Sequence, residues 1–312
     1  MTTTLLLLVL AMPAATGPTV LPAKFEADLV RVMPQTRDGK TITFYTDSGG
    51  GLFLTDAAVK RLGLTPETQK AEGSEPAMDF VHLPAFEPNA AIPPPLANDG
   101  RIGVMPSAMA VKNGFTEDGM LGEAWFGGRV WTWDYPAGRL VLEGSGWKPD
   151  ASATRVPIGL KKGETNFPRI SIRVDGEAFD VLLDTGAMTT LKPDALATLG
   201  DKGPALRATS MIVDSRFSAW KKKHPDWRVI EAAQDKTNSA MIEVPLVEIG
   251  GANVGPVWFT WRPDKNFHDY MSGMMDGKVE GAIGGNALSH FVMTVDYPGG
   301  AAYFRCARDC SR

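Results

Sequence analysis

An internal repeat is the feature that most constrains what this chain of 312 residues can fold into. In each copy an Asp-Gly pair is followed, nine residues after its aspartate, by the aspartate of an Asp-Ser-Gly or Asp-Thr-Gly motif. These two aspartates are Asp47 and Asp184. The offset of 137 residues between the copies stays constant from Asp38 to Gly63 of the first copy. A repeat that keeps one register over this length predicts a duplicated structural unit, and therefore two similar lobes.

A second pair of matching segments extends the repeat. The run 119–122 (Gly-Met-Leu-Gly) ends twelve residues before Asp134, and the run 281–284 (Gly-Ala-Ile-Gly) ends twelve residues before Asp296. The offset here is 162, so the second copy carries 25 extra residues between the two blocks. We place this insertion in the polar stretch 201–238, whose run of three lysines is typical of a solvated face.

The composition and the turn signals favour strands over helices. Glycine and proline are frequent, with 33 and 23 residues, which favours a strand-and-turn architecture over a helical bundle. Each copy predicts a hairpin leading into the Asp-containing motif, a short helix that begins near Thr55 or Pro193 and ends at Gly63 or Gly200, and a final hairpin. We predict an all-β (mainly β) fold of two pseudo-symmetric β-barrel lobes, residues 23–150 and 151–312, with short helices and a central cleft.

The N-terminus predicts a targeting segment. An apolar run from Leu5 to Leu10 is followed by small residues, which is typical of a secretory signal peptide, here residues 1–22, and is too short to span a bilayer. The alternative is a buried first strand. A signal peptide implies an exported protein, periplasmic or secreted, without stable membrane insertion after its removal. In that compartment Cys306 and Cys310 could form a disulfide; the alternative is two free thiols on a frayed tail.

Charge and residue counts exclude several classes of function. The net charge is −4 and the isoelectric point is near 5.7, so nothing predicts binding to nucleic acid. Four histidines and two cysteines cannot be assembled into a zinc or iron–sulfur spacing, so we expect no metal site. The histidines share no spacing with a serine or cysteine that would form a nucleophile–base pair. We expect Trp125, Trp131 and Trp133 to pack in the core.

The two repeated aspartates are the candidate reactive groups. One Asp-Ser/Thr-Gly motif alone is often only a tight turn, in which the carboxylate accepts backbone N–H groups and glycine supplies a positive φ. A two-fold axis between two lobes would instead bring both loops together. Two carboxylates in one site cannot both ionise at low cost, so they share a proton. The ionised one can then deprotonate water while the protonated one donates to a carbonyl oxygen.

In these motifs the sequence resembles the aspartic peptidases of the pepsin and retropepsin superfamily, in their two-lobed single-chain form. The resemblance rests on Tyr-Thr-Asp-Ser-Gly at 45–49 and Leu-Leu-Asp-Thr-Gly at 182–186, with Leu-Gly at 121–122 and Ile-Gly at 283–284 as their apolar partners. It implies an aspartic endopeptidase that needs no cofactor or metal and binds a polypeptide substrate in the cleft between its lobes; we expect a monomer. The residues that it implicates are the catalytic Asp47 and Asp184, Ser48 and Thr185, which hydrogen-bond across the lobe junction, and Gly49 and Gly186, which permit the tight turns.

The sequence also departs from this family. Pepsin-type members carry a tyrosine on a flap hairpin some forty residues after the first aspartate, but the region 77–86 contains none, so the flap is unassigned. Gly50 and Ala187 stand where pepsins often place a hydroxyl that bonds to the carboxyl pair, so we predict a mildly acidic rather than strongly acidic optimum. The alternative function is a non-catalytic peptide-binding or regulatory module, which would not need both aspartates together with Ser48 and Thr185.

Overall fold

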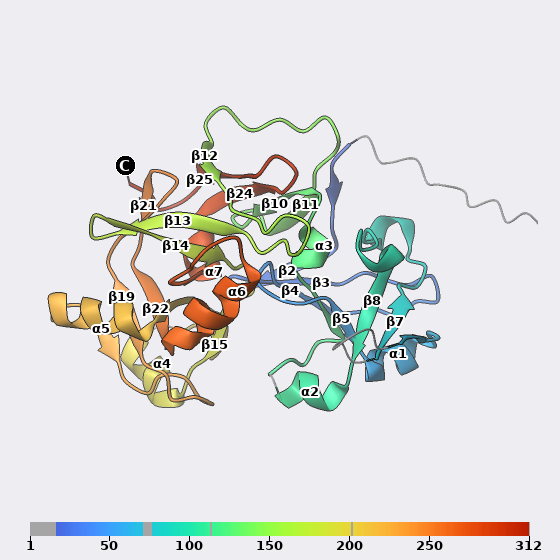
Figure 1. Cartoon of the computed structure of the whole chain (residues 1–312), viewed down its shortest axis with the longest axis horizontal. Helices are drawn as coiled ribbons and strands as arrows, with labels where there is room; N and C mark the ends of the chain where they lie inside the picture. Colours follow the sequence, from blue (N-terminus) through green and yellow to red (C-terminus); the bar gives the residue numbers. More distant parts are fainter. Residues whose placement is uncertain (1–16, 71–76, 113, 201, 312) are drawn as a thin grey trace, which may run out of the picture.

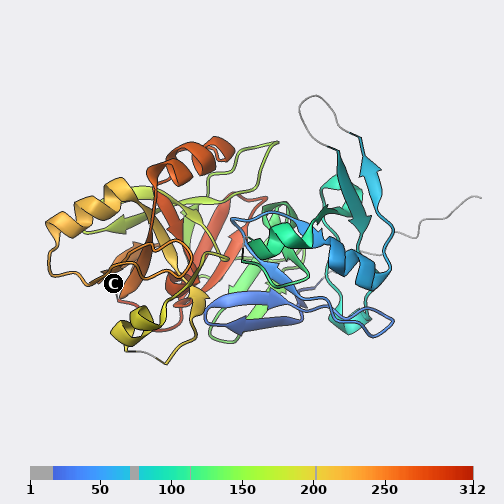
Figure 2. The same ribbon diagram turned by 90° about the horizontal axis from the view of Figure 1, so that it is seen from below.

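The computed structural model describes residues 17–70, 77–112, 114–200 and 202–311. It is a mainly β structure of two lobes that lie side by side, with a sheet contributed by both halves of the chain between them (Figure 1 and Figure 2). Within the part of the chain described, no helix is both long enough and apolar enough to cross a membrane.

The first lobe is built on an eight-stranded sheet with the order β2-β3-β4-β9-β5-β8-β7-β6. Its strands are β2 (Ala23–Glu26), β3 (Leu29–Val32), β4 (Phe44–Thr46), β5 (Phe53–Thr55), β6 (Glu67–Gln69), β7 (Met78–His82), β8 (Arg101–Met105) and β9 (Gly119–Leu121). Its helical segments are α1 (Asp56–Leu62), η1 (Pro88–Ala90), η2 (Asn98–Gly100), α2 (Ser107–Lys112) and α3 (Glu123–Phe126).

The second lobe is built on a nine-stranded sheet with the order β18-β19-β22-β17-β23-β14-β13-β20-β21, and β15 and β16 pair separately. Its strands are β13 (Arg169–Val174), β14 (Glu177–Leu183), β15 (Met188–Thr190), β16 (Leu206–Ala208), β17 (Ser210–Val213), β18 (Val229–Ile230), β19 (Met241–Val244), β20 (Val247–Ile249), β21 (Ala252–Val254), β22 (Val257–Arg262) and β23 (Gly281–Ile283). Its helical segments are α4 (Pro193–Leu199), α5 (Asp214–Lys223), the π-helical turn η3 (Asn266–Met271), α6 (Ser272–Met274) and α7 (Gly285–Leu288).

The third sheet joins the lobes. Its six strands, in the order β1-β11-β10-β24-β25-β12, come from both halves: β1 (Thr19–Val20), β10 (Val130–Asp134), β11 (Arg139–Leu142), β12 (Thr154–Pro157), β24 (Phe291–Asp296) and β25 (Ala301–Cys306). At its centre β10 pairs antiparallel with β24 and sets Thr132 opposite Thr294. Their hydroxyl oxygens are 2.8 Å apart. These two threonines are equivalent in the 162-residue repeat, so the pseudo-two-fold axis passes between them.

The predicted helices and final hairpins are confirmed. Thr55 caps α1 by accepting the N–H of Ala58, and Gly63 ends that helix in a left-handed conformation (φ 68°). Gly200 ends α4 in the same way (φ 72°), because glycine adopts a positive φ without steric cost. The pairs β10–β11 and β24–β25 form the two final hairpins.

Strand pairing corrects the predicted position of the insertion. Strand β5 begins six residues after Asp47, whereas β17, which has the same neighbours in its sheet, begins 26 residues after Asp184. Strand β5 runs antiparallel to β9 and parallel to β8. In the same way β17 runs antiparallel to β23 and parallel to β22. The registers equate Phe53 with Met211, because each pairs with the equivalent residue of the apolar-Gly strand. Of the 25 extra residues, 21 therefore precede this point, in the segment that contains β15, α4 and β16. The constant sequence offset matched α1 with α4, but in the sheet α1 corresponds to α5.

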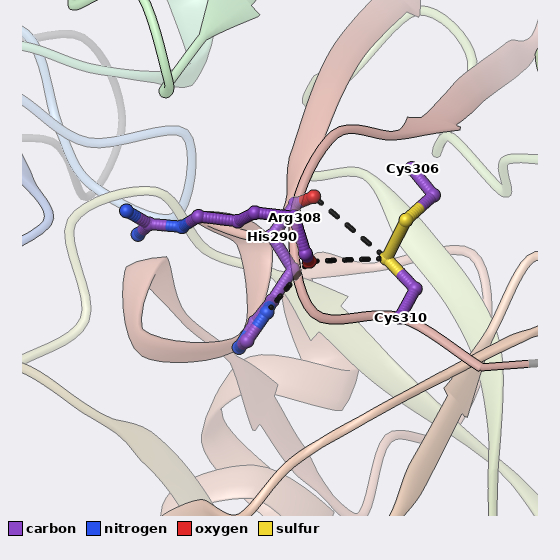
Figure 3. Close-up of a disulfide and its surroundings, with 4 residues drawn as sticks. All are labelled: His290, Cys306, Arg308 and Cys310. Carbon is purple, nitrogen blue, oxygen red and sulfur yellow. Dashed lines mark hydrogen bonds between the residues drawn. A yellow bond between two sulfur atoms is a disulfide. The ribbon is translucent and has the colours of Figure 1, made fainter.

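Both ends of the described part of the chain contribute to the folded body. Strand β1 pairs with β11 and Leu21 is buried, so a leader ending at residue 22 would include a strand of the shared sheet; residues 1–16 lie outside the described part. At the other end Cys306 and Cys310 are joined, which decides between the disulfide and the free thiols. Figure 3 shows this disulfide beside His290 and Arg308. Beyond it, Ser311 pairs with Asn253.

Candidate active site

The backbone of each Asp-containing loop is fixed by the apolar-Gly segment of its own lobe. Strand β4 runs parallel to β9, and β14 runs parallel to β23. At the ends of these strands the N–H of Asp47 donates to the carbonyl of Leu121 (3.1 Å), and the N–H of Asp184 donates to that of Ile283 (3.0 Å). The two partners are themselves equivalent in the repeat. The sheet therefore presents both aspartates in the same way.

A glycine must follow each apolar strand because another backbone passes very close to it. A Cβ on Gly122 would lie 2.1 Å from the carbonyl oxygens of Gly50 and Gly51, and a Cβ on Gly284 would lie 1.9 Å from the carbonyl oxygen of Thr209. Both distances are shorter than real Cβ contacts. The neighbours stand just before β5 and just before β17, which supports the equivalence of those two strands.

Each carboxyl group faces the loop of the other lobe. Within its own loop Asp47 accepts the N–H of Gly49 (2.8 Å), and Asp184 accepts the N–H of Gly186 (3.0 Å). Across the junction, a Cβ on Gly186 would lie 2.3 Å from Cγ of Asp47, and one on Gly49 would lie 2.8 Å from Cγ of Asp184. The structure thus brings together the two aspartates that the sequence singled out. The motif glycines are required for this approach as well as for the turn.

The two loops are tied to each other by Ser48 and Thr185. The hydroxyl of Ser48 donates to the carbonyl of Leu183 (2.7 Å) and accepts the N–H of Thr185 (2.9 Å). In return the hydroxyl of Thr185 accepts the N–H of Ser48 (3.1 Å). Both side chains are buried, so these bonds are protected from water and hold the loops in one relative position.

A further tie has no counterpart in the other lobe. The buried hydroxyl of Tyr45 donates to the carbonyl of Gly186 over 2.7 Å. The position equivalent to Tyr45 in the second copy is Leu182, which cannot make such a bond. Tyr45 therefore positions the second loop from the first lobe, a role that the motif alone does not predict.

Burial governs the charge of the carboxyl pair. It raises the pKa of Asp47, against a hydrogen bond from Asp184 and the N–H of Gly49, which lower it. Burial first, and then the charge of Asp47, raise the pKa of Asp184 well above its ordinary value. The pair therefore holds one shared proton. Such a pair can accept a proton at one oxygen and donate one at another.

A cavity of about 380 Å³ opens over the two carboxyls. The first lobe contributes Gly114 and Phe115, which follow α2. Nearly all other lining residues belong to the second lobe: Ala187, Met188, Thr189, Thr190, Leu206, Met211, Gln234, Lys236 and Arg262. Sequence reasoning identified none of these except Ala187. Four of them lie in β15 and β16, within the inserted segment.

Strand pairing also assigns the hairpin that the sequence left unassigned. Strand β7 lies in the region 77–86, where the resemblance places a flap, and it pairs antiparallel with β6 and with β8. Strands β18, β19 and β22 have the same arrangement in the second lobe. Residues 71–76 between β6 and β7 lie outside the described part. None of the described residues of β6 or β7 lines the cavity, whereas the connection from β18 to β19 contributes Gln234 and Lys236.

The positions after the two motifs are not equivalent in space. A Cβ on Gly50 would lie 2.7 Å from Cγ of Asp47 and 2.6 Å from Sδ of Met120, so a side chain there would have to displace Met120 and the Asp47 carboxyl. Ala187 is buried and lines the cavity, and its N–H is among the groups that lower the pKa of Asp184. A side-chain hydroxyl is absent from both positions, but for different structural reasons.

The other residues considered in the sequence lie away from the cavity. Trp125, Trp131 and Trp133 are fully buried in the core, as expected. His224 contacts Asp175, and His268 contacts Glu280. Neither pair lines the cavity over the two aspartates.

The sequence matches no known family model and no curated protein. The structure, however, is similar to solved structures over nearly its whole length. It matches the basic 7S globulin from soybean with a TM-score of 0.51 and 11% identity, covering 94% of this chain and 97% of the globulin. The chain has the two-lobed fold of pepsin-like proteins.

A second match is to conglutin gamma, a basic 7S globulin from lupine seeds, with a TM-score of 0.47 and 12% identity over 93% of this chain and 95% of that one. At 11% identity, the match to the soybean globulin shows the pepsin-like fold alone.

Proposed function

We propose that this chain is an aspartic endopeptidase in which Asp47 and Asp184 form the catalytic dyad. The proposal rests above all on the mutual approach of two carboxyls, on the buried Asp184 and the half-buried Asp47, whose pKa values are both raised, so that one proton is shared between them. A loop that served only as a tight turn would not need a second carboxyl against its motif glycine. Peptide hydrolysis by such a pair requires no metal or covalent nucleophile.

In this mechanism Asp47 acts first as the base and Asp184 as the acid. The ionised Asp47 removes a proton from a water molecule as its oxygen attacks the peptide carbonyl carbon, and Asp184 donates its proton to the carbonyl oxygen. The tetrahedral intermediate then collapses: the C–N bond breaks, the proton held by Asp47 passes to the leaving nitrogen, and one hydroxyl of the intermediate returns its proton to Asp184 as the carbonyl forms again. Ser48, Thr185 and Tyr45 hold the two carboxyls in position through hydrogen bonds to the backbone of the two loops and of Leu183.

The test compares wild type with two single variants on a denatured protein mixture from pH 3 to pH 8. We expect wild type to cleave internal peptide bonds, and Asp47→Asn and Asp184→Asn to cleave none while keeping the circular dichroism of the folded protein. Cleavage by all three proteins, or by none of them, would contradict the proposal. Sensitivity to pepstatin provides a second readout of the same site.

A second candidate function is peptide binding without turnover. The observation that favours it is the match to proteins named as globulins, together with the missing hydroxyls at Gly50 and Ala187. Binding of labelled peptides to wild type, with no cleavage at any pH, would select this function. We further propose that the protein is exported and monomeric, which fractionation of cells and light scattering would test.

A further inference from the structure

The cavity over the dyad contains two cationic side chains, Arg262 and Lys236. Arg262 is the last residue of β22, where it pairs with Val213. Its Nη1 atom donates to Oε1 of Gln234 (3.1 Å) and to the carbonyl of Trp261 (2.9 Å). Both contacts use the same nitrogen. Among the residues that the structure describes, Nε and Nη2 have no hydrogen-bond partner and no carboxylate forms a salt bridge with this guanidinium.

Burial gives this guanidinium an unusual environment for a cation. It lowers the pKa of Arg262 to about 10, against the charge of Asp184, which raises it. The side chain therefore stays charged throughout the range in which a carboxyl pair can share a proton. A partly desolvated cation is costly unless an anion compensates it, and the dyad supplies only one negative charge.

The neighbouring Lys236 lies at the junction of the two lobes. Its Nζ atom would be 3.6 Å from a Cβ on Gly114 of the first lobe. Like Arg262, it forms no salt bridge within the described residues. The segment that carries it is fixed by the insertion, because Asp235 donates its N–H to the carbonyl of Thr190 and Gln234 pairs with Leu191.

The equivalent position in the first lobe shows that the fold itself does not require this arginine. The paired registers of β5–β8 and β17–β22 place Met105 where the second lobe has Arg262. Met105 packs against an apolar cluster that includes Tyr45 and Phe53. The same strand end is therefore apolar on one side of the dyad and cationic on the other.

We propose that Arg262, supported by Lys236 and Gln234, forms a subsite that binds a carboxylate of the peptide substrate next to the scissile bond. The carboxylate belongs to an acidic side chain or to the chain terminus. The planar guanidinium can donate two parallel hydrogen bonds to it, and Phe115 and Met211 offer apolar contact to neighbouring substrate atoms. This inference rests on the proposed peptidase function.

The first experiment measures cleavage preference. A random synthetic peptide library is digested in two forms, with amidated and with free C-termini, and the products are sequenced by mass spectrometry. We expect wild type to favour Asp or Glu over Gln at one position beside the cleaved bond by about ten- to hundred-fold in kcat/KM. A preference restricted to the free-acid library would identify the chain terminus as the source of the carboxylate.

Variants of Arg262 distinguish binding of a substrate carboxylate from compensation of the charge of Asp184. Arg262→Met, which introduces the residue of the first lobe, should abolish the acidic preference, and Arg262→Lys should retain part of it. Arg155→Gln, an exposed arginine of β12, should behave as wild type. If Arg262→Met shifts the pH profile but keeps the acidic preference, then Arg262 only compensates the charge of Asp184 and the inference is wrong.

A binding measurement keeps the inference testable without turnover. The same libraries are captured on immobilised Asp47→Asn protein, with and without the additional change Arg262→Met. Enrichment of carboxylate-bearing peptides that depends on Arg262 supports the subsite even when no peptide is cleaved, in which case only the peptidase proposal fails. Equal recovery of acidic and neutral peptides on both proteins would overturn the subsite.

Discussion

The two lobes present their aspartates in the same way but surround them differently. In the first lobe the chain passes from the Asp47 loop into β5 within six residues, and the neighbouring strand ends at Met105. In the second lobe it takes 26 residues to reach β17, and the corresponding strand ends at Arg262. The symmetric parts of the repeat thus hold the carboxyl pair, whereas the asymmetric parts line the cavity.

The reason lies in how closely each part is packed. Gly122 and Gly284 stand against another backbone at distances that admit no side chain, so neither copy tolerates change there. The insertion of β15, α4 and β16 follows the loop, and its two strands pair with each other in a sheet separate from the nine-stranded one. It can therefore differ between lobes without displacing the dyad. It also fixes the segment that carries Gln234 and Lys236.

The largest expected effect tests whether the two lobes contribute equally to chemistry. Asp47→Asn and Asp184→Asn should each lower kcat/KM by about 10³-fold or more, because each removes one of the two carboxyl groups that share the proton. Peptide cleavage followed by mass spectrometry measures the loss. Substantial activity in Asp47→Asn alone would contradict a site with one aspartate from each lobe. It would favour a site formed in a homodimer, in which each molecule contributes its second lobe.

The next effect concerns the ties between the loops. Ser48→Ala leaves the carbonyl of Leu183 and the N–H of Thr185 without partners, and Thr185→Val leaves only the N–H of Ser48. At about 1–3 kcal/mol for each buried group left unpaired, we expect Ser48→Ala to lower the free energy of unfolding by about 2–6 kcal/mol and Thr185→Val by about half as much. Urea denaturation measures both.

The control for this pair is Thr154→Val, at an exposed position of β12. It should leave the free energy of unfolding nearly unchanged. Equal losses for Ser48→Ala and Thr185→Val would mean that the two loops depend on each other symmetrically, contrary to the hydrogen bonds described above.

A third effect is the pH dependence of stability. Both aspartates have a raised pKa in the folded protein, Asp184 the more so. The folded state therefore binds their protons more tightly than the unfolded chain, and wild type loses stability as the pH rises from the unfolded value near 3.8 to the folded one. Asp184→Asn should gain stability relative to wild type between pH 4 and pH 7, and Asp47→Asn should gain less.

Urea denaturation at pH 4 and at pH 7 tests whether Asp184→Asn gains more stability relative to wild type than Asp47→Asn does. A stability difference between variant and wild type that does not change with pH would show that the folded and unfolded pKa values are alike. In that event burial would not be controlling the charge of the dyad.

The smallest effect concerns the residues after the motifs. Ala187→Ser adds a donor beside Asp184, which favours the charged form and should move the optimum of kcat/KM to lower pH. Gly50→Ser should instead lose activity, since its Cβ would meet Asp47 and Met120. A pH profile of each variant measures the difference. An unchanged profile for Ala187→Ser, with a wild-type optimum as acidic as that of pepsin, would mean that other donors set the dyad's pKa.

Sequence reasoning could locate the dyad because its features are local and occur twice. The motif glycines, the apolar-Gly segments and the Thr55 cap each follow from steric or hydrogen-bonding needs of one short segment. Placing the insertion required knowing which strands pair. A short strand and a helix follow each aspartate in both copies, so spacing alone matched α1 with α4.

Arg262 could not be identified for a related reason. It is one of many arginines in the sequence, at the end of a strand with no special spacing. Its significance depends on the neighbours of β22 and on the first-lobe residue at the same strand end. Phe115 likewise enters the cavity only because α2 precedes β9 at the lobe junction.

The shared sheet also constrains the order of folding. It recruits β1 at one end of the described chain and β24 and β25 at the other. Pairings that span most of the sequence form slowly, because loop-closure entropy opposes them until the distant strands arrive. During synthesis the sheet that fixes one lobe against the other can be completed only when the last strands have left the ribosome. A chain with this topology can complete the sheet between its lobes only after β24 and β25 have paired, so the two aspartates reach their final relative position late in folding.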